Sequence, residues 1–345
     1  LNIGKGAVEF MAKLLNVRIN ESKEITLQNV WQAKKNLASH INKTPLIFSP
    51  KLSNLTNSEV YLKYEHLHES RSFKMRGAFN AISNLSPAQK SRGVTTFSTG
   101  NHGFAVALAA KKLGIRAVIC VSKHVPRAKI EKIKSLGAEL EIYGDGQDDA
   151  EQRCYELVKE KGLTVIPPFD HPEVIAGQGT IALEILEELP DVNCVIGGLS
   201  GGGLLSGIGL VMKTTNPDIK VIGLSMEKGA AMFESLKRGK PVTVREEPTL
   251  ADSLLGGIGE KNQYTFKMVQ QFVDQSILVE EEAIKKGMAY LYKEHNIVVE
   301  GAAAIGIGAI LNNAVSLEEN TKNVIIISGC NVDLDAHANA IEAYL

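Results

Sequence analysis

One lysine and three glycine-marked loops carry the residue types of this chain that could do chemistry. The lysine stands in Ser72-Phe73-Lys74-Met75-Arg76-Gly77, and the loops are Ser98–Gly103, Ser200–Leu204 and Ser328–Asn331. In chain order they supply a nucleophilic amine, polar groups for a carboxylate, backbone donors for a phosphate and a hydroxyl for a ring nitrogen. Each motif alone is weak evidence, so the inference rests on the combination.

Lys74 could be an ordinary surface charge or a residue with a chemical role. Taken alone, a lysine is expected to be a solvated surface charge. Its neighbours favour the chemical role, because Phe73 can cover an aromatic ring and Arg76-Gly77 opens a helix that would fix the amine. A desolvated lysine has the lowered pKa that a Schiff-base nucleophile requires. With the three loops, Lys74 predicts a pyridoxal-phosphate site.

The second glycine loop follows an apolar strand and precedes an apolar helix. Its residues are Ser200, Gly201, Gly202, Gly203 and Leu204. Backbone N–H groups at such a helix N-terminus can point at an anion. The alternative is a tight turn that needs glycine only for close packing. The loop does not have the spacing of a dinucleotide fingerprint, which disfavours a nucleotide cofactor.

The first and third loops mix several donor types. Ser98 or Thr99 could simply cap the following helix, but Asn101 and His102 go beyond that need. Ser328 closes an apolar strand, where a hydroxyl could equally serve a turn. These loops therefore add to the prediction only in combination with Lys74.

Length and composition place the chain among ordinary globular proteins. Its 345 residues suffice for two domains, and 44% of them are hydrophobic and 22% charged. The net charge of -1 gives no electrostatic reason to bind nucleic acid or an anionic membrane, so a small-molecule substrate is expected. The longest apolar run, Ala302–Leu311, is too short to cross a bilayer.

The cysteines point to a reducing compartment. Cys120, Cys154, Cys194 and Cys330 lie far apart, without a Cys-x-x-Cys pair, which disfavours a zinc site and a disulfide framework. Free thiols fit the cytoplasm. Leu1–Phe10 lack the basic start and apolar core of a secretion signal, which agrees with this location.

Short β-rich runs alternate with amphipathic stretches, which is typical of two α/β units. In the first unit the expected strands are 94–97, 117–121, 139–143 and 163–166, and the expected helices are 101–113, 128–136 and 148–161. In the second, a helix at 180–189 precedes a strand at 193–196, a helix to 212 and a strand at 220–224. We expect a ligand cleft between the units, at the carboxyl ends of strands.

From about Ile25 to Asp333 the chain resembles the fold type II pyridoxal-phosphate enzymes, and within them the serine/threonine dehydratase and serine racemase family. Besides the motifs above, the resemblance is carried by Thr44-Pro45-Leu46, Ile175–Thr180, Ala251-Asp252 and Ser328–Asp333. The segment Val299-Glu300-Gly301-Ala302-Ala303 is similar to the corresponding sequence of the hydroxyectoine-utilisation dehydratase branch.

The resemblance implies two doubly wound α/β domains with a cofactor cleft between them, as in the tryptophan synthase β fold. It implies an N-terminal extension of residues 1–24, a large cofactor-binding domain of residues 25–68 and 168–345, and a small domain of residues 69–167. It also implies a homodimer.

The resemblance also implies residue roles. Lys74 holds pyridoxal phosphate and moves the Cα proton, and Thr99 stands where racemases of the family carry a second acid/base group. The implied cofactor contacts are Phe73, Lys74, Asn101, Ser200, Gly201, Gly202, Gly203, Leu204 and Ser328. The implied substrate contacts are Ser98, Thr99, Asn101 and His102.

The expected activity is that of an ammonia-lyase, which converts a small β-hydroxy amino acid such as threonine or serine to a 2-oxo acid and ammonia. One alternative is an amino-acid racemase. An alternative of another class is a non-catalytic module that binds an anion or a nucleotide. Such a module would not bind pyridoxal phosphate covalently, and the presence of Lys74 argues against it.

The chain departs from the family pattern at several positions. Ser200 replaces a fourth glycine, and Ser253 replaces the glycine that usually follows Ala251-Asp252. Ser225 and Ala231 stand where racemase-like relatives carry acidic cation ligands, so no metal is expected. The chain ends soon after Asp333, and feedback control through a regulatory domain is not expected.

Overall fold

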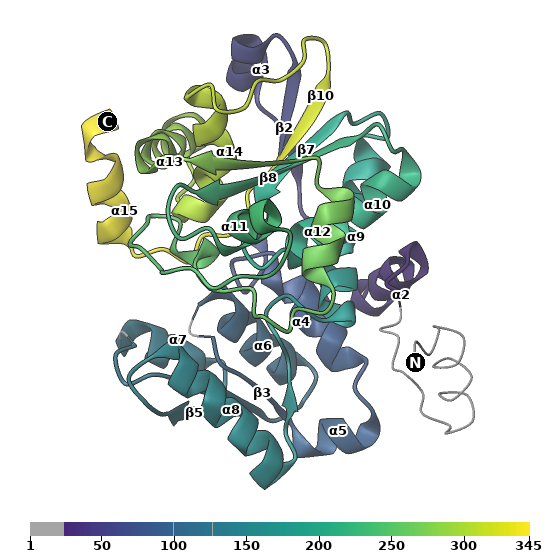
Figure 1. Cartoon of the computed structure of the whole chain (residues 1–345), viewed down its shortest axis with the longest axis vertical. Helices are drawn as coiled ribbons and strands as arrows, with labels where there is room; N and C mark the ends of the chain where they lie inside the picture. Colours follow the sequence, from purple (N-terminus) through teal and green to yellow (C-terminus); the bar gives the residue numbers. More distant parts are fainter. Residues whose placement is uncertain (1–23, 99, 126) are drawn as a thin grey trace, which may run out of the picture.

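The computed structural model describes residues 24–98, 100–125 and 127–345, and these form two sheets stacked as the upper and lower halves of Figure 1. Across the larger sheet the strands are β1 (Leu46–Phe48), β2 (Glu59–Lys63), β10 (Lys322–Ile326), β7 (Cys194–Gly198), β8 (Lys220–Met226) and β9 (Gln275–Val279). Across the smaller sheet they are β5 (Glu139–Ile142), β4 (Ala117–Val121), β3 (Val94–Thr96) and β6 (Thr164–Val165). Neighbouring strands run parallel, except that β1 is antiparallel to β2.

The larger sheet is buried on both faces because its strands are apolar at successive positions. In β10, Ile325 packs into one core, whereas Val324 and Ile326 pack into the other. The first core includes α13 (Glu281–His295) and α14 (Gly301–Leu311), and the second includes α9 (Pro172–Glu188), α10 (Gly203–Thr215), α12 (Thr265–Phe272) and α2 (Leu27–Leu37).

The smaller sheet is covered in the same way. In β4, Ile119 and Val121 face a core shared with α4 (Lys74–Ser83), α6 (Asn101–Lys112) and α7 (Arg127–Ser135). Val118 and Cys120 face α8 (Gln147–Lys161) instead. Both sheets are therefore doubly wound, which confirms the predicted fold class.

The remaining helices are short. They are α3 (Pro50–Thr56), α5 (Pro87–Arg92), α11 (Ala231–Arg238), α15 (Leu334–Ile341), and the 3-10 turns η1 (Glu65–Leu67), η2 (Asp252–Leu254) and η3 (Glu342–Tyr344). Among the described residues, the helices are too short or too polar to traverse a lipid bilayer.

The start of α9 differs from the sequence-based expectation. The helix begins at Pro172, not near Thr180, and continues through Gly177 and Gly179. A Cβ on Gly177 would lie 2.7 Å from the carbonyl oxygen of Arg76, so this glycine permits a close helix crossing and does not break the helix. Close packing, which a single sequence does not reveal, outweighs the low helix propensity of glycine here.

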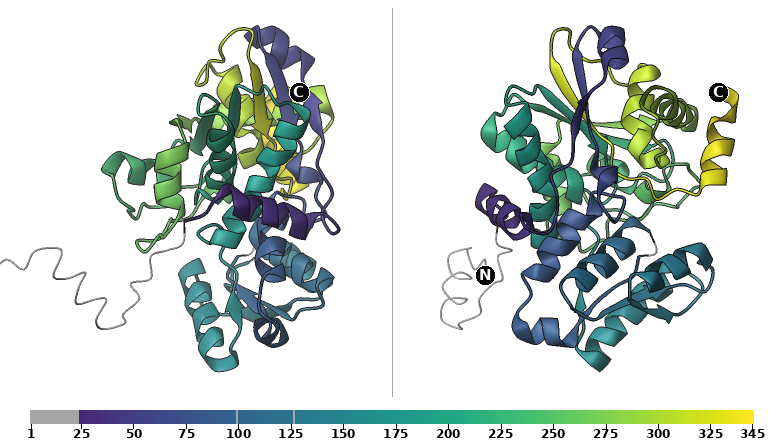
Figure 2. Two further views of the ribbon diagram at one scale, coloured as in Figure 1. Left: turned by 90° about the vertical axis from the view of Figure 1, so that its right-hand side faces the viewer. Right: turned by 180° about the vertical axis from the view of Figure 1, so that it is seen from behind.

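Both views of Figure 2 show the two sheets as separate halves of the molecule. The strands of the smaller sheet fall between residues 94 and 165, and those of the larger sheet lie before and after this segment. The predicted domain boundaries stay a prediction, and the predicted extension of residues 1–24 lies, apart from Glu24, outside the described residues.

Candidate active site

A cavity of about 1170 Å³ lies between the two halves and draws its walls from both. Eight of the sequence-predicted site residues line it: Phe73, Lys74, Ser98, Asn101, His102, Ser200, Leu204 and Ser328. Gly201, Gly202 and Gly203 form the turn between Ser200 and Leu204. The structure therefore brings together the motifs that are far apart in the sequence, whereas Thr99 lies outside the described residues.

Lys74 is the first residue of α4, and its side chain is half-buried in the cavity wall. The Nζ atom donates a hydrogen bond of 2.8 Å to the carbonyl oxygen of Pro168 and lies 5.2 Å from the ring centre of Phe73. Burial lowers the pKa of the Lys74 amine to about 8, against the opposing effect of the Glu300 carboxylate. Near neutral pH a useful fraction of this amine is uncharged and nucleophilic.

The end of β10 is hydrogen-bonded directly to the segment that carries Lys74. The backbone N–H of Phe73 donates to the carbonyl oxygen of Ser328 at 3.0 Å, and Ser72 pairs with Gly329 in an isolated β-bridge. The Ser328 side chain is buried and lines the same cavity as Lys74. This pairing explains how a hydroxyl from residue 328 reaches the same cavity as an amine from residue 74.

The glycine loop joins β7 to α10. Gly202 has φ +86°, a left-handed conformation that favours glycine, and a Cβ on Gly201 would lie 2.3 Å from the Phe169 ring. Close packing on Phe169 therefore accounts for part of the glycine pattern. The first backbone N–H groups of α10 have no partners within the helix, because its first bond runs from Ser206 to Gly202. They form the donor set expected at an anion site.

A buried carboxylate, Glu300, lies in the cavity wall and was missed by the sequence analysis as a site residue. Asn101 Nδ2 donates to its two oxygens at 2.8 and 3.0 Å, and Ser253 Oγ donates at 2.8 Å. Burial raises the pKa of Glu300, and these hydrogen bonds oppose the rise. The available signal was an acidic residue directly before the apolar helix α14.

The comparisons with known proteins decide the family. Residues 37–329 match the family described as pyridoxal-phosphate dependent enzyme. The chain belongs to this family. It is 41% identical to the L-threonine ammonia-lyase of Thermotoga maritima over 312 residues, which cover 90% of this chain and 77% of the relative. It is 38% identical to the catabolic L-threonine dehydratase of Escherichia coli over 311 residues, which cover 90% of this chain and 94% of the relative.

A solved structure shows the same fold. The structure of maize serine racemase aligns with a TM-score of 0.86 at 32% identity, covering 92% of this chain and 97% of that chain. The predicted family and the predicted cofactor are thereby confirmed. Members of this family depend on pyridoxal phosphate.

The residues around the cavity fit this cofactor chemically. Lys74 offers an amine of lowered pKa for the aldehyde, the N-terminus of α10 offers donors for the phosphate, and Ser328 offers a hydroxyl without a fixed charge. Gly201 keeps the backbone of this turn close to Phe169, because a Cβ there would clash with the Phe169 ring. Phe73 adds an aromatic face beside the amine.

His102 is neutral in this site. Its Nε2 lies 2.8 Å from the carbonyl oxygen of Ile166, which can only accept, so Nε2 carries the hydrogen. Burial, followed by the charge of Lys74, lowers the pKa of His102 to about 3. Its buried Nδ1 has no hydrogen-bond partner among the described residues. His102 therefore offers a carboxylate no positive charge.

The positions that correspond to a cation site carry no carboxylate. The Ser225 hydroxyl donates to the carbonyl oxygen of Leu199 at 2.6 Å, and Ala231 begins α11. Within residues 24–345, as far as these are described, no cluster of three or more histidine, cysteine or acidic side chains could hold a metal. Metal independence stays a prediction.

Proposed function

We propose that this protein is a pyridoxal-phosphate-dependent ammonia-lyase that converts a small β-hydroxy amino acid, threonine or serine, to a 2-oxo acid and ammonia. The observation that carries the proposal is the Lys74 amine, with its lowered pKa, in a cavity between a glycine loop and a polar loop. The relatives named as threonine ammonia-lyase and threonine dehydratase support the substrate class.

In this proposal Lys74 holds the cofactor and then moves the proton at the substrate Cα. Bound pyridoxal phosphate supplies an electron sink that makes this proton acidic. Gly201, Gly202 and Gly203, with the N-terminus of α10, hold the phosphate. Phe73 would pack beside the cofactor ring. The uncharged Ser328 hydroxyl would be the partner of the ring nitrogen and would leave it largely neutral, which suits loss of a β-substituent.

The polar loop is the proposed receptor for the substrate carboxylate. Ser98, Asn101 and His102 lie at or next to the N-terminus of α6, which favours an anion because its first N–H groups are not bonded within the helix. Thr99 is assigned to the same loop by the family resemblance. Since His102 is neutral, we assign the carboxylate to hydrogen bonds and the helix terminus, not to an ion pair.

A screen of substrates tests the proposal. Purified protein with pyridoxal phosphate is supplied with L-threonine, L-serine or 3-hydroxyaspartate, and release of 2-oxo acid and ammonium is followed. We expect equal amounts of both products from at least one of these acids. A protein that binds the cofactor but forms no 2-oxo acid from any of them contradicts the proposal.

Racemisation is the second candidate, favoured by the likeness to a solved serine racemase. It requires an acid/base group on each face of Cα. Thr99 retains a hydroxyl, but its β-branching restricts the rotamers that could aim it at Cα. We therefore expect elimination to dominate and Thr99→Ala to keep much of it, whereas Thr99→Ser should increase the formation of the opposite enantiomer, measured by chiral chromatography.

We also propose a homodimer in the cytoplasm, on the strength of the family resemblance and of cysteines that are free in the described chain. Light scattering of the purified protein tests the assembly. A monomer at micromolar concentration would contradict the dimer without affecting the proposed reaction.

A further inference from the structure

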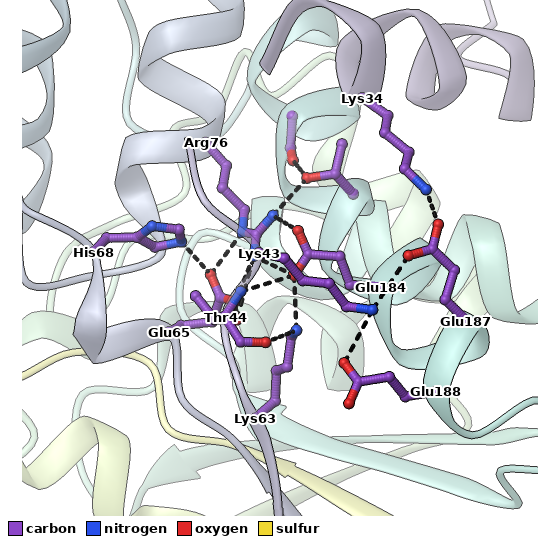
Figure 3. A network of polar contacts seen from close by, with 12 residues as sticks. Lys34, Lys43, Thr44, Lys63, Glu65, His68, Arg76, Glu184, Glu187 and Glu188 are labelled. Carbon is purple, nitrogen blue, oxygen red and sulfur yellow. Dashed lines mark hydrogen bonds and ion pairs between the residues drawn. The ribbon is translucent and has the colours of Figure 1, made fainter. Parts of the chain in front are cut away.

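Three side chains without a chemical role in the proposed reaction meet at one buried point. Thr44 comes from the loop before β1, Arg76 from α4 and Thr180 from α9. Figure 3 shows Thr44 and Arg76 around the carboxylates of Glu65 and Glu184. The side chains of Thr44, Arg76 and Thr180 are at most 4% exposed. Thr44 and Thr180 belong to segments that carry the family resemblance, and Arg76 belongs to the segment that carries Lys74.

Arg76 bridges the two carboxylates. Its Nε and Nη2 atoms donate to Glu65 at 2.7 and 2.8 Å. Its Nη1 and Nη2 atoms donate to Glu184 at 2.6 and 2.8 Å, and Nη1 also donates to Thr180 Oγ1 at 3.2 Å. A planar guanidinium with two paired carboxylates has little freedom to rotate or translate.

Lys63 completes the cluster from the end of β2. Its Nζ atom is fully buried and donates to Glu184 Oε2 and to the carbonyl oxygen of Thr44, both at 2.7 Å. Two carboxylates thus face two cations. Burial alone would raise the pKa of Glu65, but Arg76 and His68 hold it well below its ordinary value, so this carboxylate stays ionised.

The cluster holds α4 against the larger half of the molecule. Glu184 belongs to α9 and Lys63 to β2, both in that half, whereas the apolar face of α4 with Phe79 packs in the core of the smaller sheet. The crossing of α4 and α9 is close, because a Cβ on Gly77 would lie 2.9 Å from the carbonyl oxygen of Val174. The glycine at this crossing lets the two helices come close together, but it supplies no directional bonds that would hold them in place.

Lys74 is two residues before Arg76, at the start of the same helix. At about 1.5 Å of rise per residue, their Cα atoms are separated by about 3 Å along the axis. A slide or rotation of α4 would therefore displace the Lys74 amine by nearly the same distance as the helix itself. An apolar cluster of similar volume would stabilise the fold about as well, but it would not fix the position of the helix along its axis.

We propose that the buried ion-pair cluster of Lys63, Glu65, Arg76 and Glu184 is a positioning device that fixes the Lys74 amine relative to the larger half of the molecule. Its members do not line the cavity and act through α4, so they are positioning residues. The inference rests on the proposed function, in which Lys74 is the amine that holds pyridoxal phosphate.

The test compares two changes on one helix. Glu184→Gln removes a carboxylate from the cluster, and Glu187→Gln makes the same chemical change three residues later, where the carboxylate forms exposed ion pairs with Lys34 and Lys43. The full-length, cofactor-free proteins are mixed with pyridoxal phosphate. The covalent link is then reduced with borohydride at timed intervals, and the modified Lys74 peptide is quantified by mass spectrometry.

We expect Glu184→Gln to slow the modification of Lys74 by on the order of tenfold and to lower kcat similarly with little change in KM, because a displacement of about 1 Å can cost up to about a hundredfold. Glu187→Gln should behave as the unaltered protein. Thermal unfolding identifies the temperature at which each variant is folded. If folded Glu184→Gln modifies Lys74 as fast as Glu187→Gln, the proposal is wrong.

A mild variant keeps the test decisive if Glu184→Gln does not fold. Thr44→Val removes one hydroxyl that donates to Glu65 Oε1 at 2.6 Å and keeps the shape of the side chain. We expect a drop of about threefold in the same rate, and an unchanged rate overturns the proposal. If the unaltered protein instead links the cofactor at another lysine or at none, the proposed function itself has failed.

Discussion

At the scale of single residues, the site depends on an amine that has been made less basic than its free counterpart. Lys74 owes this to desolvation in the cavity wall, with Glu300 as the main opposing charge. Glu300 itself is buried among hydrogen-bond donors, Asn101 and Ser253. The site thus combines a half-buried amine with a buried, hydrogen-bonded carboxylate in one cavity.

Lys74→Ala should abolish both the covalent attachment of pyridoxal phosphate and turnover, because the same amine is assigned to both steps. Lys261→Ala is the matched control, since Lys261 also lines the cavity. The measurements are the mass of the borohydride-reduced protein and the release of 2-oxo acid. Substantial elimination by Lys74→Ala, with the cofactor still attached, would remove Lys74 from the mechanism.

The rate at which cofactor-free protein captures pyridoxal phosphate should rise with pH and level off above about pH 8. The neutral amine is the nucleophile, and burial lowers the pKa of Lys74 from its ordinary value of 10.5 to about 8, so the neutral fraction grows through that range. A capture rate that still climbs steeply at pH 10 would show that Lys74 is not desolvated.

The lowered pKa of Lys74 also predicts that the stability of the cofactor-free protein rises with pH. The unfolded chain binds more protons than the folded one between about pH 8 and 10.5, so the cofactor-free fold should gain stability with rising pH in that window.

At the scale of elements, α4 and α9 position the amine through a crossing that only glycine permits. A Cβ on Gly177 would lie 2.7 Å from both the carbonyl oxygen of Arg76 and the Cα of Gly77. Both helices would have to separate to admit a methyl group. The same separation would stretch the bonds between Arg76 and Glu184.

Gly177→Ala should therefore destabilise the protein by about 1 to 3 kcal/mol, the usual cost of overpacking a core. Gly257→Ala is the control, because a Cβ there would meet its nearest atom only at 4.0 Å. Denaturant unfolding of both variants gives the comparison. If Gly177→Ala is as stable as the control, the crossing is looser than described.

The elements that the sequence predicted are those with a strong local signal. The run Ala117–Val121 gave the bounds of β4 because its residues are apolar and mostly β-branched. Lys74 and the glycine loop were found because their types and order are unusual. Glu184 was not, because it stands near Glu187 and Glu188 and looks like one more solvated charge of a helix. Only the tertiary fold brings Lys63 and Arg76 to it.

At the scale of the whole molecule, two doubly wound sheets meet at a cavity whose groups come from both halves. The larger half contributes the glycine loop, Ser328 and Glu300, and the smaller half contributes the polar loop at the start of α6. Because α4 is joined to both, it is the element through which a relative movement of the halves would reach Lys74.

Turnover should be insensitive to chelators and to added magnesium. Ser225 and Ala231 stand where acidic ligands would be needed, and a hydroxyl and a methyl group are poor substitutes for carboxylates on a hard cation. The measurement is the rate of 2-oxo acid release before and after dialysis against EDTA. Loss of most activity, restored by a divalent cation, would show that other ligands form a metal site.

The measurement that tests the central claim most directly is a single time course with L-serine, followed by proton NMR and chiral chromatography of the same samples. It reports pyruvate, ammonium and D-serine together, in the unaltered protein with pyridoxal phosphate. The account predicts that pyruvate and ammonium appear in equal amounts and faster than D-serine. Accumulation of D-serine ahead of pyruvate would contradict it and make the protein a racemase.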